Sequence, residues 1–412
     1  MTTDETKRQT WVSAGLMIGA LFAGLCSVVG QRQGAAATAT ALAPTPNGAT
    51  ATKPLTAPPA KVAPAPLAAA QRPKVDLVFA LDTTGSMSGL IEGAKTKIWS
   101  IASFVARAQP TPDVRVGLVA YRDVGDAYVT RVYDLDADLD RVYRRLLSFR
   151  AEGGGDTPEH VARALHEAVH KMSWSTQEKS SVRIIYLVGD APPHLDYQDG
   201  YDYARAARTA AARGIQVHAI RCGTDSDTAT YWRKIASLGH GEFLTIDQNG
   251  GMHEHRTPYD DELACLHDKL SDTVVAYGAK GGATRAALEA AAAAPVAVKA
   301  ARAGFLSAKK DTADASNTLA NDLVGGVASG RVRLDDVPTA ELPRSLAALP
   351  AEARKKEVAA TAVKRGALLE EIAKVSSERD TYLRRNPEEP TSFDGQVQKT
   401  LRQAGSTAGL AF

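Results

Sequence analysis

Cysteine is scarce in this 412-residue chain, and an excess of charge of one sign is lacking. Only Cys222 and Cys265 lie beyond the first 30 residues, so at most one disulfide can form between them. Two separate buried thiols are the alternative, because a free cysteine packs as a small hydrophobe. Lys and Arg number 49 against 47 Asp and Glu, a formal net charge of +2. This balance argues against nucleic acid as a partner, and we expect none.

Motifs of common enzyme classes are also absent, because the sequence contains no P-loop and no G-x-S-x-G. H-E-x-x-H occurs as His166-Glu167-Ala168-Val169-His170, which on a helix can bind Zn²⁺ with the Glu as general base. No Gly-x-x-His follows, and a strand is expected from Val182, which leaves no second helix to bring a third ligand. A zinc-dependent hydrolase is therefore the remotest alternative, and we expect no enzyme.

The first 30 residues are typical of a signal peptide or an N-terminal membrane anchor. Lys7 and Arg8 precede an apolar stretch from Trp11 to Gly30, which is long enough to span a bilayer. Both alternatives place the rest of the chain outside the cytoplasm. We therefore expect an extracytoplasmic protein, secreted, periplasmic or anchored by residues 11–30, with membrane contact through this segment only.

Residues 31–72 are rich in Ala, Pro and Thr, as in Ala57-Pro58-Pro59-Ala60. Such a composition cannot bury a core and favours extended conformations, so we expect a disordered linker. Its length would allow a reach on the order of 100 Å. The linker would hold the following domain away from a membrane or wall.

From residue 73 to 280 the pattern alternates between strands and helices. Strands are predicted at 75–81, 114–121, 127–133, 182–188, 216–220 and 242–246, the last at an edge, with helices at 90–105, 138–148, 160–172, 201–213, 231–237 and 260–276. This alternation predicts an α/β fold, a doubly wound, mostly parallel sheet covered on both faces. The short link from Arg122 to Asp126 implies an antiparallel hairpin, which gives one antiparallel edge strand. We expect its charges, Asp123 included, to be solvated.

Residues 281–412 are predicted to form an all-helical C-terminal region. Helical sequence covers 283–303 and 306–327, and a long helix is expected over 351–383. This region forms either a helical hairpin, packed on itself or on the sheet domain, or a coiled coil that binds a partner. Gly366 and the lack of sustained heptads favour the hairpin.

Oxygen-bearing side chains follow the first predicted strand in Asp82-Thr83-Thr84-Gly85-Ser86. Thr157 lies in a glycine-rich turn before a helix, and Asp190 ends another strand. Open α/β sheets place their ligands at the carboxyl ends of the strands, where these loops meet. Two carboxylates with hydroxyls suit Mg²⁺, or Mn²⁺ or Ca²⁺. The predicted metal ligands are Asp82, Thr84, Ser86, Thr157 and Asp190. In a metal-free alternative, Ser86 and Thr157 only cap helices.

Leu81 to Met87, Gly154-Gly155-Asp156-Thr157-Pro158-Glu159 and Val188-Gly189-Asp190 resemble the von Willebrand factor A superfamily, the fold of integrin inserted domains. The resemblance covers about residues 73 to 280 and indicates an exported member of the bacterial type. It implies a metal-ion-dependent adhesion site in which Ser86 and Thr157 bind the ion directly. Asp82 and Asp190 would act largely through water, and Thr84 stands where many members have Ser.

In this superfamily the open coordination position usually takes a carboxylate from a partner, so the resemblance implies cation-dependent protein binding. We therefore expect an exported, tethered module that captures a protein ligand through its carboxylate. The alternative is a non-enzymatic assembly scaffold that acts mainly through the C-terminal helices, with the metal site structural. Removing the cation separates the two, because only the first function needs it.

Overall fold

The computed structural model describes residues 72–155, 157–248, 256–310, 321–386 and 392–412. The predicted signal peptide or anchor and the predicted linker lie outside these residues, apart from Arg72. Among the described helices, none combines the length and apolarity that a membrane crossing needs.

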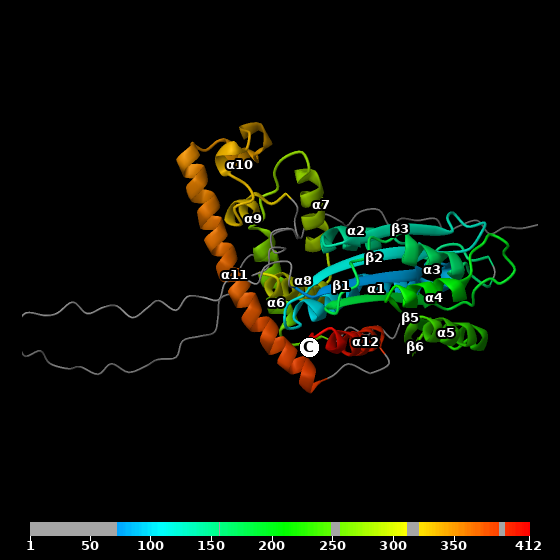
Figure 1. Ribbon diagram of the computed structural model, residues 1–412. Helices are drawn as coiled ribbons and strands as arrows, with labels where there is room; N and C mark the ends of the chain where they lie inside the picture. The colour runs from blue at the N-terminus through cyan, green and yellow to red at the C-terminus, as the bar shows by residue number, and fades with distance from the viewer. Residues whose placement is uncertain (1–71, 156, 249–255, 311–320, 387–391) are drawn as a thin grey trace, which may run out of the picture. The chain divides into compact units, whose positions relative to one another are not determined.

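The described strands form one sheet (Figure 1), with β1 at Lys74–Asp82, β2 at Asp113–Tyr121, β3 at Thr130–Asp136, β4 at Ser181–Gly189, β5 at Gln216–Cys222 and β6 at His240–Ile246. Their order is β3-β2-β1-β4-β5-β6. Neighbouring strands are parallel except β2 and β3, which pair antiparallel at one edge. The predicted fold class is therefore confirmed.

Helices cover both faces of the sheet, with α1 at Ser88–Ala106, α2 at Leu139–Leu147, α3 at Val161–His170, α4 at Tyr203–Ala212, α5 at Ser226–Leu238 and α12 at Phe393–Thr407. Leu77 and Phe79 of β1 face a core shared with α1, α2 and α12. Val78 and Ala80 face a second core shared with α3, α4 and α5. Both faces of β1 are thus buried, which explains its continuous apolar run.

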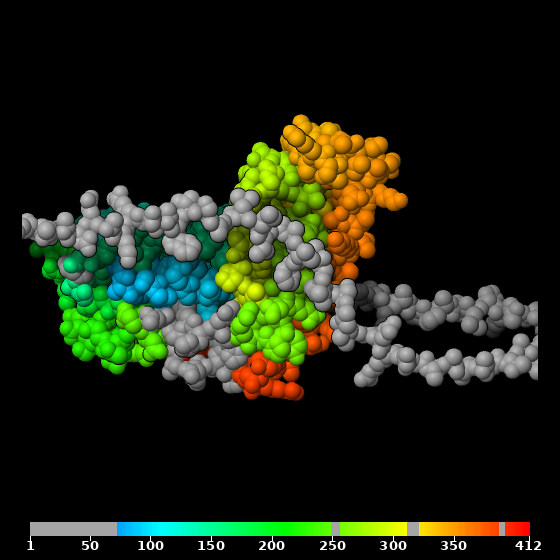
Figure 2. Space-filling model, turned by 180° about the vertical axis from the view of Figure 1, so that it is seen from behind, coloured from blue at the N-terminus to red at the C-terminus, as the bar shows by residue number. Residues whose placement is uncertain are grey.

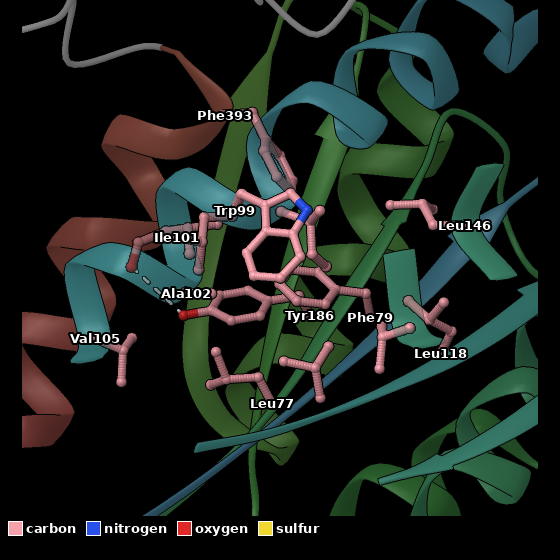
Figure 3. Close-up of a cluster of buried hydrophobic side chains, with 14 of the residues drawn as sticks. Leu77, Phe79, Trp99, Ile101, Ala102, Val105, Leu118, Leu146, Tyr186 and Phe393 are labelled. Atoms are coloured by element: carbon pink, nitrogen blue, oxygen red, sulfur yellow. Dashed lines mark hydrogen bonds between the residues drawn. The ribbon is translucent and has the colours of Figure 1, made fainter. Parts of the chain in front are cut away.

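The last helix, α12, completes the first face. Figure 3 shows Phe393 of α12 and Trp99 of α1 gathered around Phe79 and Tyr186 of the sheet. Phe79 and Tyr186 stack with ring centroids 5.3 Å apart, and the Tyr186 hydroxyl lies 2.8 Å from Thr400 Oγ1 of α12. Lys97 of α1 also donates to Asp394 at 2.9 Å. A helix from the C-terminal region therefore belongs to the packing of the sheet.

Several element boundaries differ from prediction, and three of them have a visible cause. β3 begins at Thr130 rather than 127, because the preceding residues belong to the loop, in which the Val129 carbonyl accepts from the Arg122 amide at 3.0 Å and the Tyr128 hydroxyl lies 2.7 Å from Thr83 Oγ1. α5 begins at Ser226 rather than 231, because the Asp225 side chain caps it by accepting from the Thr228 amide at 2.6 Å. α6 ends at Ser271 rather than 276, where Thr273 Oγ1 donates to the Leu270 carbonyl at 2.6 Å.

The remaining helices are α6 at Asp260–Ser271, α7 at Gly281–Ala292, α8 at Val296–Ala308, α9 at Leu323–Ala328, α10 at Arg344–Ala347 and α11 at Ala351–Arg385. The predicted 283–303 helix is broken between α7 and α8 by Pro295, which lacks the amide that a helix interior needs. The long helix is confirmed as α11. Leu368 and Ile372 of α11 pack against α6 and α8, so the long helix is buried on one side by these two neighbouring helices.

A buried ion pair ties three helices together. Arg302 of α8 donates to both carboxylate oxygens of Asp140 in α2, each at 2.8 Å, and both side chains are 2% exposed. Its Nη1 lies 2.9 Å from His267 Nε2 of α6. The bidentate geometry satisfies two charges that would be costly to bury alone.

Acid is expected to destabilise the fold through His218 and His267. Burial lowers the pKa of His218 to about 4. Burial and the adjacent Arg302 do the same for His267. As the pH falls, the unfolded histidines take up protons near pH 6.5, before the folded ones do. The contribution of the two histidines to the stability of the fold is therefore complete above about pH 6.5 and is lost as the pH falls toward 4. We expect each histidine to lower the free energy of unfolding by about 2 kcal/mol at pH 5 relative to neutral pH, and urea denaturation at the two pH values measures this difference.

The variant His218→Gln isolates one of these contributions. It removes a titrating group while keeping an acceptor for the Glu242 amide, which donates to His218 Nδ1 at 3.0 Å. We expect the loss of stability between pH 7 and pH 5 to shrink by about 2 kcal/mol in this variant. An unchanged loss would show that His218 does not contribute to acid unfolding.

Candidate metal centre

The first loop of the candidate site folds around the Asp82 carboxylate. Asp82 ends β1 fully buried, and its Oδ1 accepts from the Thr84 amide at 2.9 Å and from Thr84 Oγ1 at 2.7 Å. Thr84 Oγ1 lies 3.3 Å from Ser86 Oγ. Ser86 is exposed while Thr84 is buried. Three of the predicted ligands therefore form one contiguous set of oxygens that opens to the surface.

The second loop, residues 152–159 with 156 outside the described residues, lies directly against the first. The Glu152 amide donates to the Thr83 carbonyl, and the Gly85 amide donates to the Gly153 carbonyl, both at 3.1 Å. Gly154 has φ +78°, and a Cβ there would lie 3.0 Å from Thr84 Cβ. Glycine is therefore needed for both the turn and the close approach. Exposed Thr157 is carried on this loop.

The third loop begins where β4 ends beside β1. A Cβ on Gly189 would lie 3.1 Å from Asp82 Cβ and 3.2 Å from Asp82 Oδ2. Asp190 follows, half-buried, close enough to Asp82 for the two carboxylates to repel each other. The structure thus places the five predicted ligands on three loops that meet at one edge of the sheet.

The Asp82 carboxylate is electrostatically unsatisfied. Its Oδ2 is buried with no hydrogen-bond partner among the described residues. Burial, chiefly, and the Asp190 carboxylate raise the pKa of Asp82 to about 7, although the hydrogen bonds from Thr84 oppose the shift. A cation bound here would remove that penalty, so the residues present fit a divalent ion.

Glu159 and Asp123 add carboxylates that the sequence prediction did not assign to the site. Glu159 is 3% exposed and its Oε2 has no partner among the described residues. Burial, followed by the Asp82 and Asp123 carboxylates, raises the pKa of Glu159 to about 9. The sequence could have indicated Glu159, because it ends the motif Gly154-Gly155-Asp156-Thr157-Pro158-Glu159. The cluster of carboxyl groups at this edge therefore extends beyond the five ligands.

The prediction that the hairpin-turn charges are solvated is wrong for Arg122 and Asp123, which are 3% and 4% exposed. Arg122 Nη2 donates to the Arg150 carbonyl at 2.8 Å, and its Nε donates to the Thr83 carbonyl at 3.1 Å. Asp123 Oδ2 accepts from the Tyr197 hydroxyl at 2.6 Å. Contacts with three other loops bury this turn, and no pattern within the turn itself indicates them.

Gln248, just after β6, reaches across the edge to the site. Its Nε2 donates to Asp190 Oδ2 at 2.5 Å and lies 3.5 Å from the Ser86 carbonyl oxygen. A Cβ on Gly223 would lie only 2.1 Å from Gln248 Oε1, so the glycine leaves room for this side chain. A fourth strand end therefore contributes a polar side chain to the site, and nothing in the local sequence marks it.

Among the described residues, the H-E-x-x-H helix gains no third ligand for a zinc peptidase site. Glu167 is 1% exposed and its Oε1 accepts from Arg163 Nε at 3.2 Å and from Lys171 Nζ at 2.9 Å, so it is held in ion pairs rather than beside a metal-bound water. The His166 and His170 rings stack at 4.2 Å. Within the described ranges, no three His, Cys, Asp or Glu side chains are grouped to hold a metal. The candidate site differs in kind, because it combines carboxylates with hydroxyls.

The two cysteines are separate. Cys222 is a buried thiol at the end of β5, Cys265 is half-buried in α6, and the two do not form a disulfide. The alternative of two thiols is thus the one that the structure shows.

The sheet order, the helical layers and the oxygen-rich edge define a doubly wound α/β domain with a candidate metal centre at the ends of its strands. Residues 76–237 match the sequence model of the von Willebrand factor A domain. This part of the chain is therefore a von Willebrand factor A domain.

Two curated proteins are similar to part of the chain. A putative ariadne-like RING finger protein of Acanthamoeba polyphaga mimivirus is 23% identical over 189 residues, 42% of this chain and 18% of that protein. The alpha-protein kinase vwkA of Dictyostelium discoideum is 30% identical over 122 residues, 29% of this chain and 19% of the kinase. The chain thus spans less than a fifth of the length of either relative.

Solved structures are also similar in part. Proximal thread matrix protein 1 from the mussel byssus has a TM-score of 0.34 at 13% identity, covering 43% of each chain. The SpRpn10 VWA domain has a TM-score of 0.33 at 14% identity, covering 43% of this chain and 89% of that one. A third structure is the mussel protein with a zinc-occupied metal-ion-dependent adhesion site (MIDAS) motif. It has a TM-score of 0.33 and 14% identity over 42% of each chain.

Proposed function

We propose that this protein is a divalent-cation-dependent protein-binding module that captures a partner carboxylate. The observation that carries the proposal is the buried, unpartnered Asp82 Oδ2 at an edge where hydroxyls and a second carboxylate converge. A buried carboxylate without a partner is unfavourable in isolation and favourable beside a cation. No nucleophile or general base is needed for this function, and we propose that the protein is not an enzyme.

Mg²⁺ is the proposed ion, with Mn²⁺ or Ca²⁺ as substitutes. Ser86 and Thr157 would bind it through their hydroxyls, with Thr84 beside them, and Asp82 and Asp190 would act largely through water. The bound ion supplies positive charge and an exchangeable coordination position. The residues of this chain orient the set, because Thr84 fixes the Asp82 carboxylate through two hydrogen bonds and the glycine-rich loop closes over Thr84.

We further propose that the module is exported and held at a distance from its anchor. The support is the sequence alone, through the apolar residues 11–30 and the Ala/Pro-rich residues 31–72. Fractionation of cells that produce the full-length chain tests it, since recovery of the intact chain in the cytoplasm would contradict export.

Cation binding is the direct test of the site, with Mn²⁺ as the probe and the full-length chain as the protein. The variant Asp82→Asn keeps the acceptor for Thr84 and removes the charge. We expect the Mn²⁺ affinity measured by calorimetry to fall by about 10- to 100-fold, as for losses of groups that orient a metal site. The variant should also lose the rise in Tm that Mn²⁺ gives the native protein.

The matched control is Asp272→Asn, which removes an exposed carboxylate at the end of α6. It should bind Mn²⁺ like the native protein. In EDTA, Asp82→Asn should melt no lower than the native protein, because it removes a buried unpaired charge. Native-like Mn²⁺ binding by Asp82→Asn would rule out this site.

The scaffold alternative has one observation in its favour. An apolar pocket of about 500 Å³ is lined by α9, α11 and residues 332–335, including Val324, Leu334 and Val358. Val363, which follows the pocket residue Ala362 in α11, is 76% exposed. Figure 2 shows the orange residues of α10 and α11 at the surface of this part of the chain. Partner capture that persists in EDTA and is lost in Val363→Asp would support the scaffold over the cation module.

A further inference from the structure

We propose that the edge around the cation site is a docking surface for a basic peptide segment whose acidic residue is flanked by Lys or Arg and by one large apolar side chain. This rests on the proposed function and names the chemistry of its partner. The docking surface consists of the loops that follow β1, β2, β4 and β5, together with residues 152–155 and with Asp247 and Gln248 after β6.

Two exposed apolar side chains flank the ion-binding loop. Val124 is 57% exposed on the loop after β2, and Leu195 is 60% exposed on the loop after β4. β2 and β4 are the two neighbours of β1, whose end carries Asp82. Among the described residues only Val363 and Phe412 are also large, apolar and exposed. Apolar exposure is therefore concentrated at this edge, where it favours an apolar partner group.

The two loops are joined, so the apolar pair is held in place. Asp123 Oδ2 accepts from the Tyr197 hydroxyl at 2.6 Å and lies 3.3 Å from His194 Nε2. The His194 and Tyr197 rings stack at 4.1 Å with an interplanar angle of 15°. Val124 directly follows Asp123, and Leu195 directly follows His194. A preorganised surface of this kind loses little conformational freedom when a partner binds.

The same edge is strongly acidic although the whole chain is nearly neutral. Its loops carry the exposed carboxylates Glu152, Asp196, Asp199, Asp225 and Asp247. Arg122, the arginine within these loops, is buried against loop carbonyls, and Arg150, which adjoins residues 152–155, donates from Nη1 to the Leu147 carbonyl at 2.9 Å. A surface of this sign attracts basic groups and repels acidic ones.

Buried charge beneath the surface points to a ligand independently. Glu159 Oε2, Asp123 Oδ1 and Asp82 Oδ2 are each buried without a hydrogen-bond partner among the described residues. In their ionised form these groups would repel a carboxylate from a partner unless a cation and positive side chains came with it. The cation supplies the first condition. Lys or Arg beside the partner's acidic residue supplies the second.

A degenerate peptide library tests the proposal. The probe is a set of synthetic peptides with a central Asp flanked on each side by three random residues without cysteine. The immobilised full-length chain selects from it in Mg²⁺, and EDTA elutes the peptides for sequencing. We expect enrichment of Lys and Arg and of one aliphatic or aromatic residue among the eluted peptides. Flat or acidic preferences would overturn the proposal.

Two variants separate the two features of the surface. Leu195→Ser should lower the affinity of a selected peptide by about tenfold and remove the apolar preference while keeping the basic one. Glu152→Lys combined with Asp247→Lys should remove the basic preference and lower affinity several-fold, more at low salt. Val363→Ser is the matched control, since it alters an exposed apolar residue on α11, and it should change neither preference.

The readouts distinguish failure of this inference from failure of the proposed function. Both edge variants should bind Mn²⁺ as the native chain does, because neither removes a proposed ligand. If the native chain binds Mn²⁺ and Asp82→Asn does not, but the edge variants select the same peptides as the native chain, the docking surface is wrong and the cation site stands. If the native chain binds no Mn²⁺, the proposed function fails and takes this inference with it.

Discussion

Removal of α12 is expected to unfold the sheet domain. A chain that ends after Ser392 would lose the buried side chains of Phe393, Val397 and Leu401. Each fully buried side chain of this size contributes about 1.5–3 kcal/mol, so their sum approaches the total stability of a typical domain, about 5–15 kcal/mol. The cut would also expose Phe79 and Tyr186, which α12 covers (Figure 3). We expect loss of the cooperative thermal transition in calorimetry.

A milder substitution keeps this expectation quantitative. Leu401→Ala leaves a cavity against the sheet and should cost about 2–5 kcal/mol in urea unfolding. Gln403→Ala is the matched control on the same helix, because Gln403 is exposed, and it should change the free energy of unfolding by less than about 0.5 kcal/mol. A truncated chain that still melts cooperatively at the native temperature would show that α12 is dispensable.

The second large effect is expected at the buried ion pair of Arg302 and Asp140. Arg302→Met removes one partner and leaves the Asp140 carboxylate, 2% exposed, without its bidentate donor. Breaking a buried pair in this way costs about 3–5 kcal/mol, because the remaining charge is uncompensated. Urea unfolding at pH 7 measures the loss directly.

The double variant Asp140→Asn with Arg302→Met tests that reason. It removes both charges, so it should recover much of the stability that Arg302→Met loses. Arg285→Met on exposed α7 is the matched single control and should change the unfolding free energy by less than about 0.5 kcal/mol. A double variant no more stable than the single one would mean that the loss comes from packing and not from the unpaired charge.

The sheet was predictable because its signal is local. Val75 to Leu81 and Val182 to Val188 are apolar without interruption, as expected for strands buried on both faces, and both lie in the centre of the sheet as β1 and β4. The short link after Tyr121 predicted the antiparallel pairing of β2 and β3, which the structure contains. Strand type and direction followed from pattern and connection length alone.

The candidate site was predictable to the same extent. Asp82, Thr84 and Ser86 follow one strand directly, so their proximity needs only a local turn. Asp190 required the further rule that parallel strands end at one edge. Thr157 lies between α2 and α3 rather than after a strand, so the glycine-rich motif and not this rule indicated it. Gln248 and the burial of Asp123 followed no such rule, because each depends on contacts between loops distant in sequence.

The sequence by itself determined the type of fold, the edge that carries the oxygens and the helical character of residues 281–412. Only the tertiary structure decided that α12 returns to cover β1 and β4 while α6 packs with α8 and α11. The physical reason is that an apolar stripe at positions such as Phe393, Val397 and Leu401 shows that a helix will be buried on one side. Which surface buries it is settled by shape and by buried pairs such as Lys97 with Asp394, which form only once distant segments meet.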